Sequence, residues 1–169
     1  MLKEKNKVIL SLIKKEISLS ELLSTYDKYY DGVNICRDLF NAREKKDSEA
    51  VDLFLYLGSV IGYEYNCVEL LNKLLTDTWH KKHEELVRLL SHYKDESSIG
   101  YLFRAASLQL DYLDYDEDHV LADKCIRALA KINTNESIEK IKELSHSNEI
   151  SIKNSANRQL KKYQTSKTK

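Results

Sequence analysis

The chain has 169 residues, of which 42% are hydrophobic and 32% charged, with no proline, four glycines and a formal net charge of zero. This length allows one domain with a real hydrophobic core, and the share of apolar residues excludes an intrinsically disordered chain. Tight β-turns depend on proline and glycine, so their scarcity predicts an all-α protein. No stretch approaches the ~20 apolar residues that cross a membrane.

Three features of the chain predict a cytoplasmic protein. Cys36, Cys67 and Cys125 are isolated, odd in number and without CxxC spacing, which predicts three reduced thiols. The apolar run 8–13 is interrupted by Ser11 and followed at once by charged residues, so we expect no signal peptide. No membrane association is expected either.

Apolar residues recur at helical spacing along the first half of the chain. Ser18 or Ser20, Asn34, and Asp47 or Ser48 are positioned to cap the helices that follow them. The run 51–62 is apolar almost all round, and we interpret it as a central buried helix whose Gly58 and Gly62 allow close helix contact. The expected helices cover residues 2–17, about 19–29, 34–46, 48–62 and 67–79.

The second half contains an internal repeat. The segment from Val87 to Leu102 corresponds to the segment from Ile126 to Ile141, with an offset of 39 residues throughout. A third, partial copy relates residues 121–132 to residues 152–163 with an offset of 31 residues. Each copy predicts a pair of amphipathic helices, and helix pairs repeated every ~30–40 residues are typical of α-solenoids.

The two offsets differ by eight residues, the length of the segment 111–118 between two copies. We therefore interpret this segment as an insertion, and insertions in solenoids lie in loops on one edge, often the binding edge. It contains five carboxylates and two tyrosines. They are Asp111, Tyr112, Asp114, Tyr115, Asp116, Glu117 and Asp118.

Charge is unevenly distributed along the second half of the chain. Residues 95–123 hold eight acids and one base, and residues 124–169 hold eleven bases and four acids. Such blocks indicate docking of a charged partner, or they neutralise each other across the fold.

The segments Trp79–Leu86, Tyr112–Glu117 and Lys124–Ile132 resemble bacterial HEAT-repeat proteins, in particular small ones encoded as immunity proteins beside secreted or contact-delivered toxins. The resemblance covers residues 76–163. It implies a short, right-handed superhelix of about nine or ten helices in antiparallel pairs. We expect a single HEAT-like domain over residues 1–163 and a disordered tail over residues 164–169.

The resemblance also implies a function, namely binding and neutralising the C-terminal domain of a cognate toxin. The acidic, tyrosine-bearing segment is the candidate contact, because tyrosines supply rigid contact area and carboxylates raise the rate of association. If the toxin is a nuclease, this segment would mimic phosphate. Trp79, His80 and His83 are weaker candidates for the same partner-binding surface.

No pattern of residues predicts a metal, a cofactor or catalysis. Asp114, Asp116 and Asp118 begin like a calcium loop, but His119 and Cys125 stand where the glycine and the bidentate glutamate are needed. His80 and His83 are three residues apart rather than four, so we expect a neutral pair on an exposed helix start instead of a zinc site. We expect no enzyme activity and no small-molecule substrate.

One rival function uses the basic C-terminal helices. Arg127, Lys131, Arg158, Lys161 and Lys162 recur at helical spacing, and some HEAT-like proteins bind or repair DNA on a basic surface. A nucleic-acid-binding domain usually carries a net positive charge, whereas this chain is neutral, so nucleic acid is not the expected partner. A generic HEAT scaffold is a third alternative.

Overall fold

The structure is a computed structural model that describes residues 1–113 and 119–167. These residues form ten α-helices and two short 3-10 helices, with no strand among them, which confirms the all-α prediction. The chain divides into two compact units, one formed by residues 1–70 and 79–81 and the other by residues 71–78 and 82–169. No helix within the described ranges combines the length and hydropathy needed to span a membrane.

The first unit contains four helices, three of which begin at polar caps, whereas α1 begins at Met1 without a side-chain cap. The side chains of Ser18, Asn34 and Asp47 each accept a hydrogen bond from a backbone N–H of the following helix, and Glu21 completes a capping box with Ser18. These caps confirm the helix starts predicted from the sequence. The helices are α1 (Leu2–Ile13), α2 (Leu19–Tyr30), α3 (Ile35–Glu44) and α4 (Ser48–Ile61).

Helix α4 is the buried helix of this unit and packs against α1 and α3. Its two glycines do not form the helix contact that their spacing predicted. A Cβ on Gly58 would collide with the hydroxyl of Tyr65, so this glycine makes room for an aromatic side chain from the following loop. Gly62 lies at φ 62° and ends the helix in the left-handed conformation.

A buried ion pair joins α1 to α3. Lys5 Nζ donates to both carboxylate oxygens of Asp38, at 2.7 and 2.8 Å, and both side chains are 1% exposed. The same ammonium lies 5.4 Å from the ring centroid of Tyr26 and 5.2 Å from that of Tyr30, both on α2. Burial and the Asp38 carboxylate together raise the pKa of the Tyr26 phenol above its usual range.

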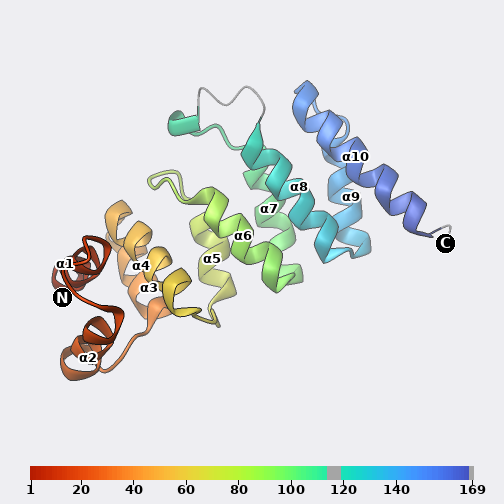
Figure 1. Ribbon diagram of the computed structural model, residues 1–169. Coiled ribbons are helices and arrows are strands. Elements are labelled where there is room, and N and C mark those ends of the chain that lie inside the picture. The colour runs from red at the N-terminus through yellow and green to blue at the C-terminus, as the bar shows by residue number, and fades with distance from the viewer. Residues whose placement is uncertain (114–118, 168–169) are drawn as a thin grey trace. The chain divides into compact units, whose positions relative to one another are not determined.

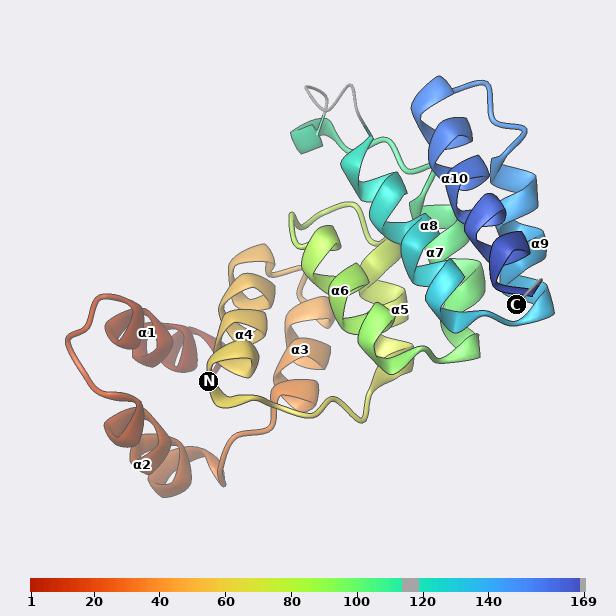
Figure 2. The same cartoon turned by 45° about the vertical axis from the view of Figure 1, so that its right-hand side comes forward.

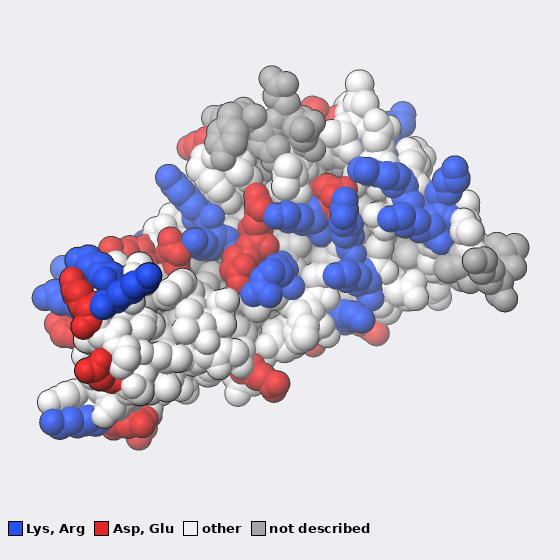
Figure 3. Space-filling model, in the orientation of Figure 1, with Lys and Arg blue, Asp and Glu red and all other residues white. Residues whose placement is uncertain are grey.

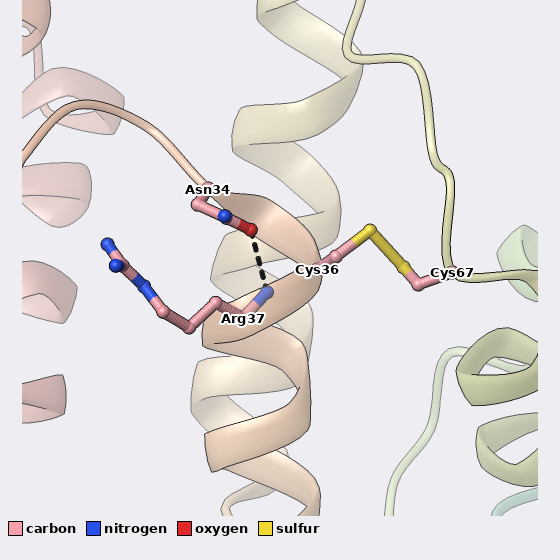
Figure 4. The surroundings of a disulfide bond; sticks show 4 residues. All are labelled: Asn34, Cys36, Arg37 and Cys67. Atoms are coloured by element: carbon pink, nitrogen blue, oxygen red, sulfur yellow. Dashed lines mark hydrogen bonds between the residues drawn. A yellow bond between two sulfur atoms is a disulfide. The ribbon is translucent and has the colours of Figure 1, made fainter.

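A disulfide between Cys36 and Cys67 ties the first turn of α3 to the segment that precedes α5 (Figure 4). The prediction of three reduced thiols was therefore wrong for these two residues. The two cysteines are 31 residues apart, and their Cα atoms lie 6.0 Å apart only because the turn after α4 returns the chain toward α3. Cys125 is a free and fully buried thiol.

Helix α5 (Val68–Thr76) begins in the first unit and continues into the second, which is built from five further helices in two rows. In one row α8 packs between α6 and α10, and in the other α7 packs against α9 (Figures 1 and 2). The helices are α6 (His83–Tyr93), α7 (Ile99–Ala105), α8 (Val120–Ile132), α9 (Asn135–Leu144) and α10 (Ile150–Lys167).

The 39-residue repeat has a direct structural counterpart in this unit. Val87 on α6 and Ile126 on α8 are both buried, as are Ser98 and Ser137 at the starts of α7 and α9. The turns match too. Lys94 and Asn133, which are 39 residues apart, end α6 and α8 in the left-handed conformation, and the residues after them, Asp95 and Thr134, cap the next helix. The repeat thus determines both the buried faces and the turns.

The third copy corresponds to α10, where Ile152 and Ala156 are buried at the positions of Leu121 and Cys125 on α8. Helix α10 extends to Lys167, so residues 164–167 of the segment expected to be disordered are helical. The acidic insertion begins in a 3-10 helix, η2 (Asp111–Leu113), and lies between α7 and α8, as the two offsets predicted.

Candidate functional site

Of the acidic segment 111–118, the structure describes residues 111–113, and it continues from His119. Asp111 is exposed and Tyr112 is half-buried in η2. The predicted contact residues Asp114, Tyr115, Asp116, Glu117 and Asp118 lie outside the described residues. Their assignment to a partner-binding surface stays a prediction.

Tyr112 anchors the start of this segment on α6. Its hydroxyl lies 2.8 Å from Nδ1 of His83, and the two rings stack with centroids 5.7 Å apart. His83 Nε2 lies 2.8 Å from the carbonyl oxygen of Asp77. Because a carbonyl only accepts, Nε2 carries the proton, and in the neutral ring Nδ1 accepts from the Tyr112 hydroxyl. The segment after α7 is thereby joined to the segment that precedes α6.

The burial of His80 and His83 contradicts the prediction of an exposed imidazole pair. His83 is fully buried and His80 is 1% exposed. His80 contacts the half-buried Trp79 edge to face, with ring centroids 5.1 Å apart. Trp79 and His80 belong to the first unit, and His83 belongs to the second with Tyr112. His83 therefore positions Tyr112 and is not itself a surface contact.

A groove of about 1300 Å³ runs between α8 and α10 in the second unit. Its lining includes Arg127 and Lys124 from α8 and Arg158 and Lys161 from α10. Figure 3 shows Lys and Arg side chains gathered over α6, α8 and α10, with acidic side chains among them. Of the five basic residues that the rival function used, three line this groove, Lys131 lines a second groove between α6 and α8, and Lys162 lines neither.

Asp123 organises the middle of the α8–α10 groove. Its carboxylate forms an ion pair with Arg127 Nε at 2.7 Å and accepts a hydrogen bond from Arg158 Nη2 at 3.4 Å. It also accepts a hydrogen bond from the Ser155 hydroxyl, which is buried beneath it. One carboxylate therefore holds two guanidinium groups side by side, one from each helix.

The head of the groove, where α8 and α10 begin, has a different character. Ser151 on α10 lies within hydrogen-bond distance of His119 Nδ1, at 2.8 Å, which links the starts of the two helices. Val120 and Ile150 line the same end and are 40% and 74% exposed. The head of the groove thus exposes aliphatic side chains beside the polar side chains of His119, Glu149 and Ser151, and the rest of the groove carries the basic side chains.

The neighbouring groove between α6 and α8 carries paired charges. Lys124 contacts Glu84, and Arg88 Nη2 contacts Glu85 at 2.6 Å. The hydrogen bond from Arg88 lowers the pKa of the Glu85 carboxyl below its usual value. Because of these ion pairs, the surface formed by α6, α8 and α10 carries both basic and acidic side chains and is not uniformly basic.

Two observations in the described part of the chain concern a thiol nucleophile and a metal site. Burial raises the pKa of the Cys125 thiol far above its usual value, so it does not form the thiolate that a nucleophile needs. Across the described ranges, no group of three or more metal-ligating side chains is arranged to hold a metal ion.

The basic residues of the groove were predicted from the sequence, but the residues that contact them were not. Asp123 and Ser155 were not predicted, because they lie 32 residues apart and meet only when α8 and α10 stack. The offset of 31 between these helices was the available signal, because it places Arg127 and Arg158 at equivalent positions of neighbouring helices.

Comparison with models of protein families, with curated proteins and with solved structures gives no match to this chain.

Proposed function

We propose that this chain is a non-enzymatic protein-binding module of HEAT-like, α-solenoid architecture, acting as an immunity protein that binds and neutralises the C-terminal domain of a cognate bacterial toxin. The solenoid part of the proposal draws support from the repeat, whose copies share buried positions, caps and left-handed turn residues in the second unit. The immunity part draws on the sequence resemblance of residues 76–163.

The observation that supports a binding role most directly is the attachment of the acidic segment. Tyr112 is fixed through His83 to the start of α6, so the segment leaves the helix rows from a defined point. A segment anchored in this way loses less conformational freedom on binding than a free loop. Exposed Asp111 beside Tyr112 begins the acidic surface that would meet a basic toxin face.

Pairwise co-expression with the toxin encoded by the neighbouring gene tests this function. We expect the two proteins to co-purify and the toxin to be inactive in the complex. Charge reversal at Asp111, Asp114, Asp116 and Asp118 should weaken the complex and flatten its dependence on salt. Unchanged affinity and unchanged salt dependence would show that the acidic segment is not the contact.

The basic grooves favour a second candidate, binding of duplex DNA along α8 and α10. Lys124, Arg127, Arg158 and Lys161 supply positive charge along the groove. Asp123 lies between the two arginines and would face the phosphates. Because the grooves carry both signs of charge, a protein partner is the better-supported proposal.

A further inference from the structure

The α8–α10 groove is lined by more basic than acidic side chains. Lys124, Arg127, Arg158 and Lys161 give its lining four positive side chains. Asp123 and Glu149 are the two carboxylates of the same lining, so four positive charges minus two negative charges leave the lining with two positive charges in excess. Lys124 is in addition paired with Glu84 of α6, which lies outside this lining. The excess is concentrated along one channel between two helices.

Arg127 and Arg158 remain accessible to a further carboxylate. Arg127 and Arg158 are 58% and 61% exposed although both contact Asp123. Each guanidinium has five N–H donors, and the contacts with Asp123 use one nitrogen of each. Both side chains line a groove that opens to solvent, and a carboxylate is one of the groups that guanidinium forks bind in bidentate geometry.

The side chains that line the groove differ between its head and the rest of its length. Val120 and Ile150 expose aliphatic surface at its head, and Arg127 is seven residues further along α8, about 10 Å away at the rise of an α-helix. An occupant that fits this pattern has aliphatic side chains at one end and carboxylates about 10 Å further along.

We propose that this groove binds an acidic segment of the partner protein, with aliphatic residues at the Val120–Ile150 end and carboxylates between Arg127 and Arg158. The proposal rests on the proposed function and adds a second contact of opposite charge to the acidic segment. Such a pair of contacts fixes the orientation of a partner, because the reversed orientation brings like charges together.

A nucleic acid fits the same groove less well. A duplex presents a continuous row of phosphates, which would face Asp123 and Glu149 as well as the basic residues. The phosphate backbone offers no aliphatic group to cover Val120 and Ile150.

A labelled synthetic peptide with two leucines at one end and four glutamates at the other is the first probe, made in both sequence orders. Fluorescence anisotropy should show binding by the full chain that weakens with salt. Replacing the glutamates by lysines should abolish it. The double variant R127Q/R158Q should bind the glutamate peptide about tenfold more weakly, because two exposed ion pairs are lost.

The matched control is K3Q/K153Q, which removes two positive charges from exposed positions outside the groove lining. It should bind the peptide like the parent chain. Circular dichroism of both double variants checks that they remain folded. Equal weakening by both pairs would attribute the binding to net charge and overturn the proposed site, as would absence of peptide binding.

A short DNA duplex is the second probe. Tighter binding of the duplex than of the glutamate peptide, lost in R127Q/R158Q and kept in K3Q/K153Q, would assign the groove to nucleic acid and overturn the proposal. A toxin complex that needs Asp111 and Tyr112 but is indifferent to R127Q/R158Q would overturn the groove proposal while leaving the proposed function intact. Absence of any toxin complex, with peptide binding retained, would reject the proposed function alone.

Discussion

The hydroxyl of Tyr112 lies 2.8 Å from Nδ1 of His83, and this pair joins the acidic segment after α7 to the start of α6. His83 is fully buried and also bonded to the Asp77 carbonyl, so the tyrosine is held by a side chain that is itself fixed. Removing this contact tests whether the anchor matters for binding.

Tyr112→Phe should keep the ring stacking and remove the hydrogen bond, with a loss of about 0.5–1.5 kcal/mol in the free energy of unfolding. Its affinity for the proposed toxin partner should fall, because His83 would no longer hold the side chain at position 112 by a hydrogen bond. Denaturant unfolding and calorimetric titration measure the two effects. Tyr101→Phe is the matched control at another half-buried tyrosine of the second unit, and an equal loss of affinity there would remove the special role of Tyr112.

Lys5 and Asp38 form the buried ion pair of the first unit. Lys5→Met leaves the Asp38 carboxylate buried without its cation, which should lower the free energy of unfolding by about 3–5 kcal/mol. Adding Asp38→Leu to Lys5→Met should recover much of the loss, because no charge then remains buried. Lys7→Met, at an exposed position of the same helix, should be nearly neutral in the same denaturant titration. A double variant as unstable as Lys5→Met alone would contradict this account.

Cleavage of the Cys36–Cys67 disulfide should destabilise the first unit. The bond closes a loop across a sequence separation of 31, and loops of this length are worth about 3–4 kcal/mol in the chain-entropy treatment. Dithiothreitol should lower the midpoint of thermal unfolding of the parent chain. The variant C36S/C67S should unfold at the lower temperature with or without the reductant. If dithiothreitol still lowered the midpoint of this variant, its effect on the parent chain could not be assigned to the disulfide.

The three thiols should differ in reactivity toward iodoacetamide. Burial raises the pKa of Cys125, so it should stay unmodified in the folded chain at neutral pH. After reduction, the half-buried Cys36 and Cys67 should react first. Mass spectrometry of the intact protein counts the added groups, and rapid labelling of Cys125 under native conditions would contradict its burial.

Helices, caps and the repeat were predictable because they depend on residues close together in the sequence. Ser18, Asn34 and Asp47 act on the turn that follows them, and the 39-residue offset links positions of like environment. The pairing of Lys5 with Asp38 joins residues 33 apart, and a charged pair gives no periodic signal of its burial. The sequence therefore predicted the helices, except that α1 ends at Ile13 and α5 at Thr76 rather than at residues 17 and 79. It left out the interactions between the helices.

For the candidate site, too, the position of the segment was predictable and the contacts between distant residues were not. The position of the acidic segment between α7 and α8 came from the difference between two offsets. His83 was taken for an exposed residue, because a histidine among lysines and glutamates has the sequence pattern of a surface helix. The ring of Tyr112, 29 residues away, stacks on His83, and no local pattern reveals this contact.

The most direct test of the account is the affinity of the purified chain for the toxin domain proposed as its partner, measured by calorimetry at low and high salt. We predict a tight one-to-one complex whose affinity falls with salt, is weakened by charge reversal in the acidic segment and leaves the toxin inactive. No complex with the toxin, together with salt-dependent binding of duplex DNA, would contradict the central claim.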